Sequence, residues 1–107
     1  MYKYKDTVEV GGNSLTIKLI EGSSTVVDVG NVADLCYQKN EIRISTKCTD
    51  GTNRCLDFLN ESLIHEFVEV IKIVYALEKL EETDVERIAQ GMWQILKQYK
   101  FNLIEEV

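Results

Sequence analysis

The spacing of the apolar residues changes halfway along the chain, and this change constrains the fold more than any other feature. Between residues 7 and 45, apolar and polar residues alternate, as they do in half-buried β-strands. Gly11-Gly12 and the polar residues 38–40 interrupt the alternation and predict two tight turns. The sequence therefore predicts two β-hairpins, built from residues 7–10, 15–20, 32–37 and 41–45.

After residue 55 the apolar residues recur every three or four positions, which is the spacing of helices. A long helix with a broad apolar face is expected from residue 56 to about residue 77. Thr83 and Glu86 match a capping box, so a second helix is expected to begin there. Its expected buried stripe consists of Val85, Ile88, Ala89, Met92, Ile95, Leu96 and Tyr99.

Strands in the first half of a chain and helices in the second are typical of an α+β fold. With 107 residues and no segment that resembles a linker, the chain is expected to form one domain over residues 1–107. We expect an N-terminal antiparallel sheet of three to four strands, followed by a long helix and a C-terminal helix.

The acidic side chains are concentrated in the second half of the chain. The formal net charge is −6, and residues 56–107 carry 5 basic and 11 acidic side chains, which accounts for the whole excess. This distribution argues against direct nucleic-acid binding, which requires a basic surface. Mimicry of DNA by the acidic helices is a weaker alternative. No apolar run approaches the ~20 residues of a membrane span, and the first residues lack a signal-peptide core, so we expect a cytoplasmic protein without a membrane segment.

The chain has three cysteines, Cys36, Cys48 and Cys55. An odd number of cysteines in a cytosolic protein indicates reduced thiols. Cys48 and Cys55 are seven positions apart, which is not the CxxC spacing of a zinc knuckle. We therefore expect free thiols with a structural role or none.

The segment His65-Glu66-Phe67-Val68-Glu69 reads HExxE and differs by one residue from the HExxH signature of zinc peptidases. On a helix, positions 65 and 69 lie on the same face, because residues four apart are neighbours there. Imidazole and carboxylate are both zinc ligands, and Glu66 occupies the position of the general base in such enzymes. His65 and Glu69 are therefore candidate metal ligands, and Glu66 is a candidate catalytic residue.

Each of these three residues also has an ordinary alternative role. His65 would be a surface histidine flanked by acidic residues one turn away. Glu69 would be a solvent-facing partner of Lys72, a pairing that contributes at most ~0.5 kcal/mol. Glu66 would be an exposed helix residue without a function.

The predicted order of elements, together with Leu63-Ile64-His65-Glu66, resembles small phage- and prophage-encoded proteins of the zinc-metallopeptidase type, which are similar to minimal zincins. The resemblance covers roughly residues 14 to 100. In the first half it rests on a glycine, an acidic residue and a strand of alternating isoleucines, found here as Gly30, Asp34, Ile42 and Ile44. In the second half it rests on the HExx helix and on residues 86–96 as the last helix.

The resemblance implies that His65 is the first metal ligand, that Glu66 is the base and that Glu86 is the glutamate ligand. The second histidine of the family falls on Glu69, where this chain departs from the pattern. Capping of the second helix competes for the Glu86 carboxylate. Glu86 also reaches the site only if the first helix ends near Tyr75.

The resemblance further implies a zinc cofactor and a peptidase activity. Because Glu69 replaces a neutral ligand with an anion, we expect weak or absent zinc binding and no robust peptidase activity. In this interpretation an exposed strand of the sheet aligns an extended peptide substrate. The alternative is a non-enzymatic phage protein on the same fold that binds a protein partner through its acidic helical face.

Overall fold

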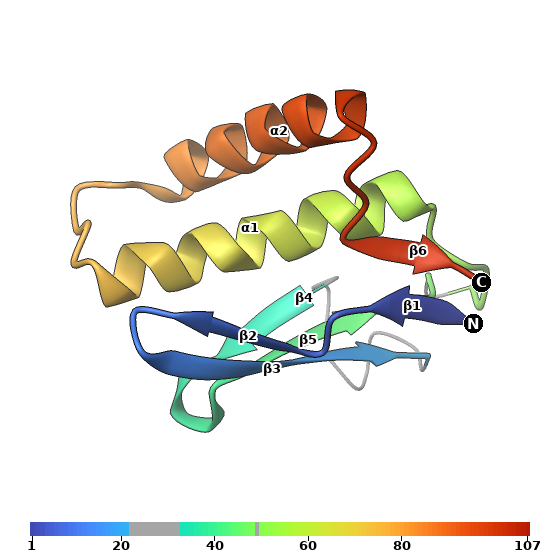
Figure 1. The fold of residues 1–107 in the computed structure, drawn as a ribbon, viewed down its shortest axis with the longest axis horizontal. Helices are drawn as coiled ribbons and strands as arrows, with labels where there is room; N and C mark the ends of the chain where they lie inside the picture. Colours follow the sequence, from blue (N-terminus) through green and yellow to red (C-terminus); the bar gives the residue numbers. More distant parts are fainter. Residues whose placement is uncertain (22–32, 49) are drawn as a thin grey trace.

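The computed structural model describes residues 1–21, 33–48 and 50–107, and these form a four-stranded sheet covered on one face by a helix, with a second helix packed on the other side of the first (Figure 1). The expected α+β fold, with an N-terminal sheet followed by two helices, is confirmed. The elements in chain order are β1 (Tyr2–Tyr4), β2 (Thr7–Val10), β3 (Asn13–Ile20), β4 (Ala33–Cys36), the 3-10 helix η1 (Tyr37–Lys39), β5 (Glu41–Ser45), α1 (Leu56–Val74), α2 (Glu82–Gln98) and β6 (Ile104–Glu106).

Both expected hairpins form, although residue 32 lies outside the described residues. β2 and β3 pair antiparallel through Gly11 and Gly12, whose φ angles of 55° and 82° suit a turn in which both central residues are left-handed. β4 and β5 also pair antiparallel, and η1 followed by the left-handed Asn40 joins them. The strand order of the sheet is β2-β3-β5-β4, so β4 is an edge strand.

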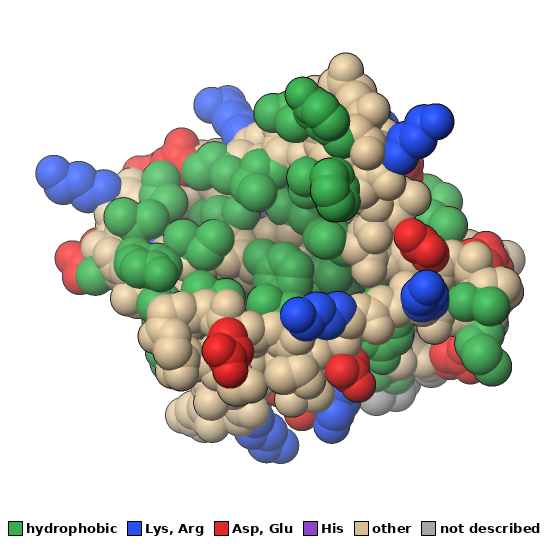
Figure 2. Space-filling view, viewed as in Figure 1, with side chains coloured by type: hydrophobic (Ala, Val, Ile, Leu, Met, Phe, Trp, Pro, Cys, Tyr) green, Lys and Arg blue, Asp and Glu red, His purple; other side chains and the backbone are tan. Residues whose placement is uncertain are grey.

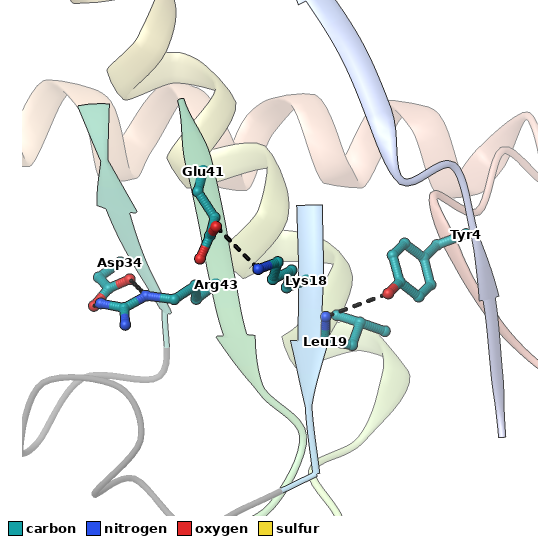
Figure 3. A network of polar contacts seen from close by, with 6 residues as sticks. All are labelled: Tyr4, Lys18, Leu19, Asp34, Glu41 and Arg43. Atoms are coloured by element: carbon teal, nitrogen blue, oxygen red, sulfur yellow. Dashed lines mark hydrogen bonds and ion pairs between the residues drawn. The ribbon is translucent and has the colours of Figure 1, made fainter. Parts of the chain in front are cut away.

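The two hairpins join through β3 and β5, and these two strands are parallel. The sheet is therefore mixed, and the expectation of a wholly antiparallel sheet is corrected in this detail. The physical reason is that alternation of apolar and polar residues identifies the buried face of a strand and not its direction. Side chains on the outer face of the sheet pair across the strands, as in Lys18 with Glu41 at 3.1 Å (Figure 3).

The helix α1 has two buried faces, because it lies between the sheet and α2 (Figure 1). Its contacts with the sheet include Leu59, Leu63 and Val70, which pack with isoleucines of β3 and β5. Its contacts with α2 include Ile64 and Val68, which pack on a second cluster made of Val85, Ala89 and Trp93. This double burial explains the broad apolar face that the sequence predicted for α1.

α1 ends at Val74, three residues before the expected end, and the termination does not use glycine. Ala76 adopts the left-handed conformation at φ 54°. The backbone N–H of Leu77 donates to the carbonyl of Lys72 at 2.9 Å, and that of Ala76 donates to Ile73 at 3.3 Å. This hydrogen-bond pattern is the Schellman motif, and it turns the chain back toward the middle of α1.

The start of α2 corrects the expected capping box. Asp84 accepts a hydrogen bond from the backbone N–H of Glu81 at 2.9 Å, so the box consists of Glu81 and Asp84. The expected pair, Thr83 and Glu86, lies two residues later. Glu81 and Asp84 have the same three-residue spacing as Thr83 and Glu86, and the earlier pair forms the box.

The expected buried stripe of α2 is only partly buried. Val85 and Ala89 are buried, and Leu96 is half-buried against the same cluster. The other four residues of the stripe are exposed, and we call them the outer stripe: Ile88, Met92, Ile95 and Tyr99. The reason is that α2 packs on α1 and not on the sheet, so it has one narrow buried face.

Two short strands that the sequence did not indicate bring the chain ends together. β1 and β6 pair antiparallel over three residues each. Asn60 of α1, which is 1% exposed, fixes β6 in place. Its amide nitrogen donates to the carbonyls of Leu56 at 2.9 Å and Ile104 at 3.0 Å. Its amide oxygen accepts from the backbone N–H of Leu103 at 2.8 Å and of Ile104 at 2.9 Å.

Two further observations bear on the sequence-based expectations. None of the helices in the described part of the chain combines the length and apolar character that crossing a membrane requires. Cys36, Cys48 and Cys55 all carry free thiols.

Candidate metal centre

His65, Glu69 and Glu82 converge at the place where the start of α2 passes the middle of α1. His65 Nε2 lies 3.1 Å from Glu82 Oε1 and 4.0 Å from Glu69 Oε1. One ligand atom from each of the three residues lies within 4.8 Å of the other two. His65 and Glu69 are neighbours because they are one helical turn apart, as the sequence predicted. Glu82 is brought to them by the backward turn after α1.

The resemblance assigned the third ligand to Glu86, but the structure brings Glu82 to the cluster instead. Glu86 lies one turn further along α2 and lines a hollow that His65 and Glu66 also line. No sequence pattern indicated Glu82, because its place depends on where α1 ends and on α2 beginning at Glu82 and not at Thr83.

The cluster lies between two adjoining hollows of about 410 and 400 Å³. Ala33, His65, Glu66 and Glu82 line both hollows. The first hollow extends along α2, and the second extends along β4 and η1. The side chain of Glu82 is 65% exposed, so the cluster is open to solvent and to a ligand.

The two carboxyl groups of the cluster interact unfavourably when both are charged. The pKa of Glu69 is raised, first by burial, then by a hydrogen bond with the Glu82 carboxyl and by the charge of Glu82. Glu69 Oε1 is buried and accepts no hydrogen bond within the described part of the chain. A cation between these groups would offset the repulsion between the two carboxylates.

Glu66 is buried, although its sequence position allowed an exposed residue. It is 8% exposed, and none of the described residues donates a hydrogen bond to it. Burial raises the pKa of Glu66 to about 7, and the charges of Glu69, Asp34 and Glu82 add to this effect. A signal for this burial was present, because Leu63 and Val70 are three and four positions away and therefore adjacent to Glu66 on the helix.

The described residues of the first half that carried the resemblance are not part of the three-residue cluster, although Asp34 lines the second hollow beside it. Asp34 is on β4 and receives hydrogen bonds from the guanidinium of Arg43, one of them at 2.9 Å from Nε (Figure 3). This pair holds β4 to β5 and leaves Asp34 outside the three-residue cluster. Ile42 and Ile44 belong to the hydrophobic core. Gly30 lies outside the described residues.

The comparisons with known proteins find no matching family model, no matching curated protein and no matching solved structure.

The buried Glu66 predicts a loss of stability as the pH rises. Below pH ~4.5 the folded and unfolded states both hold the proton. Between pH 4.5 and about 7 the unfolded chain releases it first, because its pKa is the lower one. The full difference between the two pKa values corresponds to roughly 3 kcal/mol of unfolding free energy. We expect about 2 kcal/mol of this loss to be measurable between pH 5 and 8 in metal-free protein.

Urea unfolding at a series of pH values, with a chelator present, measures this loss. Glu66→Gln cannot ionise, so its stability should fall less steeply and exceed that of the wild type at pH 8. Glu9→Gln, on the exposed side of β2, is the control and should follow the wild type. Parallel curves for Glu66→Gln and the wild type would show that the Glu66 carboxylate is solvated.

Proposed function

We propose that His65, Glu69 and Glu82 bind a divalent cation and that the protein is a metallopeptidase-like hydrolase of extended peptides. The observation that carries the proposal is the convergence of an imidazole and two carboxylates beside the buried Glu66, which accepts no hydrogen bond from a described residue. Acidic clusters alone are common on protein surfaces. A buried carboxyl group beside such a cluster is uncommon when it faces the same hollows and accepts no hydrogen bond from a described residue.

The cluster fits a small divalent cation. Ligand atoms that share a cation at about 2.0–2.2 Å lie roughly 3 to 4.3 Å apart. The two separations measured from His65 Nε2, 3.1 and 4.0 Å, are within that span. One imidazole and two carboxylates form a harder donor set than structural zinc receives, so Mn²⁺ and Fe²⁺ are suited to it and zinc binding is weak.

The position of Glu66 suits a general base. When bound, the cation acts as a Lewis acid that polarises a water molecule and the peptide carbonyl. Glu66 follows a ligand directly in sequence and lines both hollows beside the cluster. It is thus placed to accept a proton from a water molecule and to return it to the departing amine.

The edge strand β4 suits an extended peptide as the substrate. Its outer edge pairs with no strand in the described part of the chain, so its backbone groups are available for a further strand. Ala33, Leu35 and Tyr37 line the hollow that leads from this edge to the cluster. The remaining lining is rich in glutamate, which favours peptides with lysine or arginine near the cleaved bond.

A cleavage assay tests the proposal. We expect slow hydrolysis of basic peptides that requires Mn²⁺ or Zn²⁺, is removed by chelator, and is restored by the added metal. Glu66→Gln should reduce the rate by about 100-fold, since a general base contributes at least that much. Metal binding by this variant should persist, which separates the base from the ligands.

The matched control is Glu61→Gln, which lines the first hollow but is not part of the cluster. It should change the rate only slightly. Equal activity of Glu66→Gln and the wild type, or hydrolysis that survives chelation, would refute the proposed roles.

A further inference from the structure

The outer stripe of α2 has the spacing of a coiled-coil seam. Ile88, Met92, Ile95 and Tyr99 follow one another at steps of four, three and four residues, which is the a/d pattern of a heptad. Their exposed fractions are 38%, 42%, 58% and 72%. Hydrophobic side chains gather over α1 and α2 on the face shown in Figure 2. This surface is more apolar than a monomer's scattered exposed residues.

Gly91 leaves open space beside the outer stripe of α2. A glycine inside a helix costs about 1 kcal/mol relative to alanine. A Cβ atom at Gly91 would meet nothing within 4 Å, so packing within the described chain does not require the glycine. Gly91 precedes Met92 at the centre of the outer stripe. A missing side chain there permits close contact with a helix from outside.

The charges along α2 specify how two copies would pair. Residues 81–90 contain four acidic side chains and one basic one, whereas residues 91–100 contain two basic side chains and no acidic one. Antiparallel pairing of two α2 helices places the acidic end of each beside the basic end of the other. Parallel pairing would place like charges together, which is unfavourable.

The available area suits a weak dimer. The four residues of the outer stripe have exposed fractions of 38% to 72%. If a fully exposed large apolar side chain presents about 200 Å², they offer roughly 400 Å² per chain. Two copies would then bury roughly 800 Å², which is the size of a weak, transient interface.

We propose that the protein forms a two-fold symmetric dimer in which the outer stripes of two α2 helices pack antiparallel. Ile88 of one copy contacts Tyr99 of the other, and Met92 contacts Ile95 near the two-fold axis. Glu82, Glu86 and Gln90 lie on another side of α2, where they line the first hollow. The dimer therefore leaves the His65, Glu69 and Glu82 cluster of each copy open. Its existence does not depend on the proposed hydrolase activity.

Sedimentation equilibrium over a range of concentrations tests this proposal. The wild type should reach twice the chain mass of 12.3 kDa. Ile95→Glu places a charge near the two-fold axis and should raise the dissociation constant at least about 100-fold. Gln94→Glu adds the same charge beside the stripe and is the control, with little effect. Circular dichroism should be used to check that both variants are folded.

A wild type that stays monomeric up to millimolar concentration would overturn the proposal, as would an Ile95→Glu variant that dimerises as tightly as the wild type. Cysteine crosslinking tests the orientation in a background where the three native cysteines are serine. The double variant Ile88→Cys, Tyr99→Cys should form disulfides between residue 88 of one copy and residue 99 of the other. Bonds between the two residues 88 would instead show parallel pairing and contradict the geometry.

Discussion

Replacing Asn60 with leucine is expected to lower the free energy of unfolding by about 4 kcal/mol, because several buried backbone groups lose their partners together. Asn60 uses both amide hydrogens and both lone pairs of its oxygen, and two of its four partners are the N–H and carbonyl of Ile104. Ile104 is fully buried, so water cannot replace the lost hydrogen bonds. Leucine has the same branched arrangement of side-chain heavy atoms and a larger volume, so the substitution leaves no cavity that could account for the loss.

Urea denaturation followed by circular dichroism measures this effect. A loss of about 4 kcal/mol is a large part of the 5–15 kcal/mol that a small domain has, so the variant should be partly unfolded at 37 °C. Asn102→Leu, at an exposed position in the same C-terminal segment, is the control and should cost less than about 0.5 kcal/mol. A loss of less than 1 kcal/mol for Asn60→Leu would show that β6 is not fixed by this side chain.

The sequence predicted those parts of the fold that depend on local periodicity. The two hairpins follow from alternation around Gly11-Gly12 and around residues 38–40, and α1 follows from a long 3.6-residue period. The parallel pairing of β3 and β5 was not predictable in this way, because strand direction in a sheet depends on contacts between distant segments. β1 and β6 contain three residues each, which is too short for a periodic signal, and they depend on Asn60.

The candidate site was predictable within α1 and not beyond it. His65 and Glu69 are neighbours in any helix that contains both of them. The residue that α2 contributes depends on where α1 ends, and that end is set by Ala76 in a left-handed conformation. Alanine gives no sequence signal for such a turn, whereas glycine would. The resemblance indicated Glu86, whereas the cluster in the structure contains Glu82, one turn earlier.

The exposure of the outer stripe was also not predictable from the apolar spacing of α2. An apolar period identifies residues that avoid water, and it does not say whether their partner is in the same chain. Val85 and Ala89 contact α1, while Ile95 and Tyr99 face solvent in the single chain. A second copy is the partner that the proposed dimer supplies.

Calorimetric titration of metal-free protein with Mn²⁺ and Zn²⁺ tests the central claim, that His65, Glu69 and Glu82 form a cation site, most directly. We expect one cation per chain, with a dissociation constant of roughly 1–100 µM for zinc. Glu82→Gln keeps the size of the side chain and removes a ligand charge. It should weaken binding by more than about 100-fold, since even residues that only support a ligand contribute 10- to 100-fold. His65→Ala and Glu69→Gln should behave in the same way.

Glu86→Gln is the matched control, because it makes the same chemical change one turn further along α2. We expect this variant to bind the cation almost as tightly as the wild type, while Glu82→Gln binds it more than about 100-fold more weakly. The opposite result, in which Glu86→Gln loses binding and Glu82→Gln retains it, would contradict the assignment of the third ligand, and no binding by the wild type would contradict the site itself.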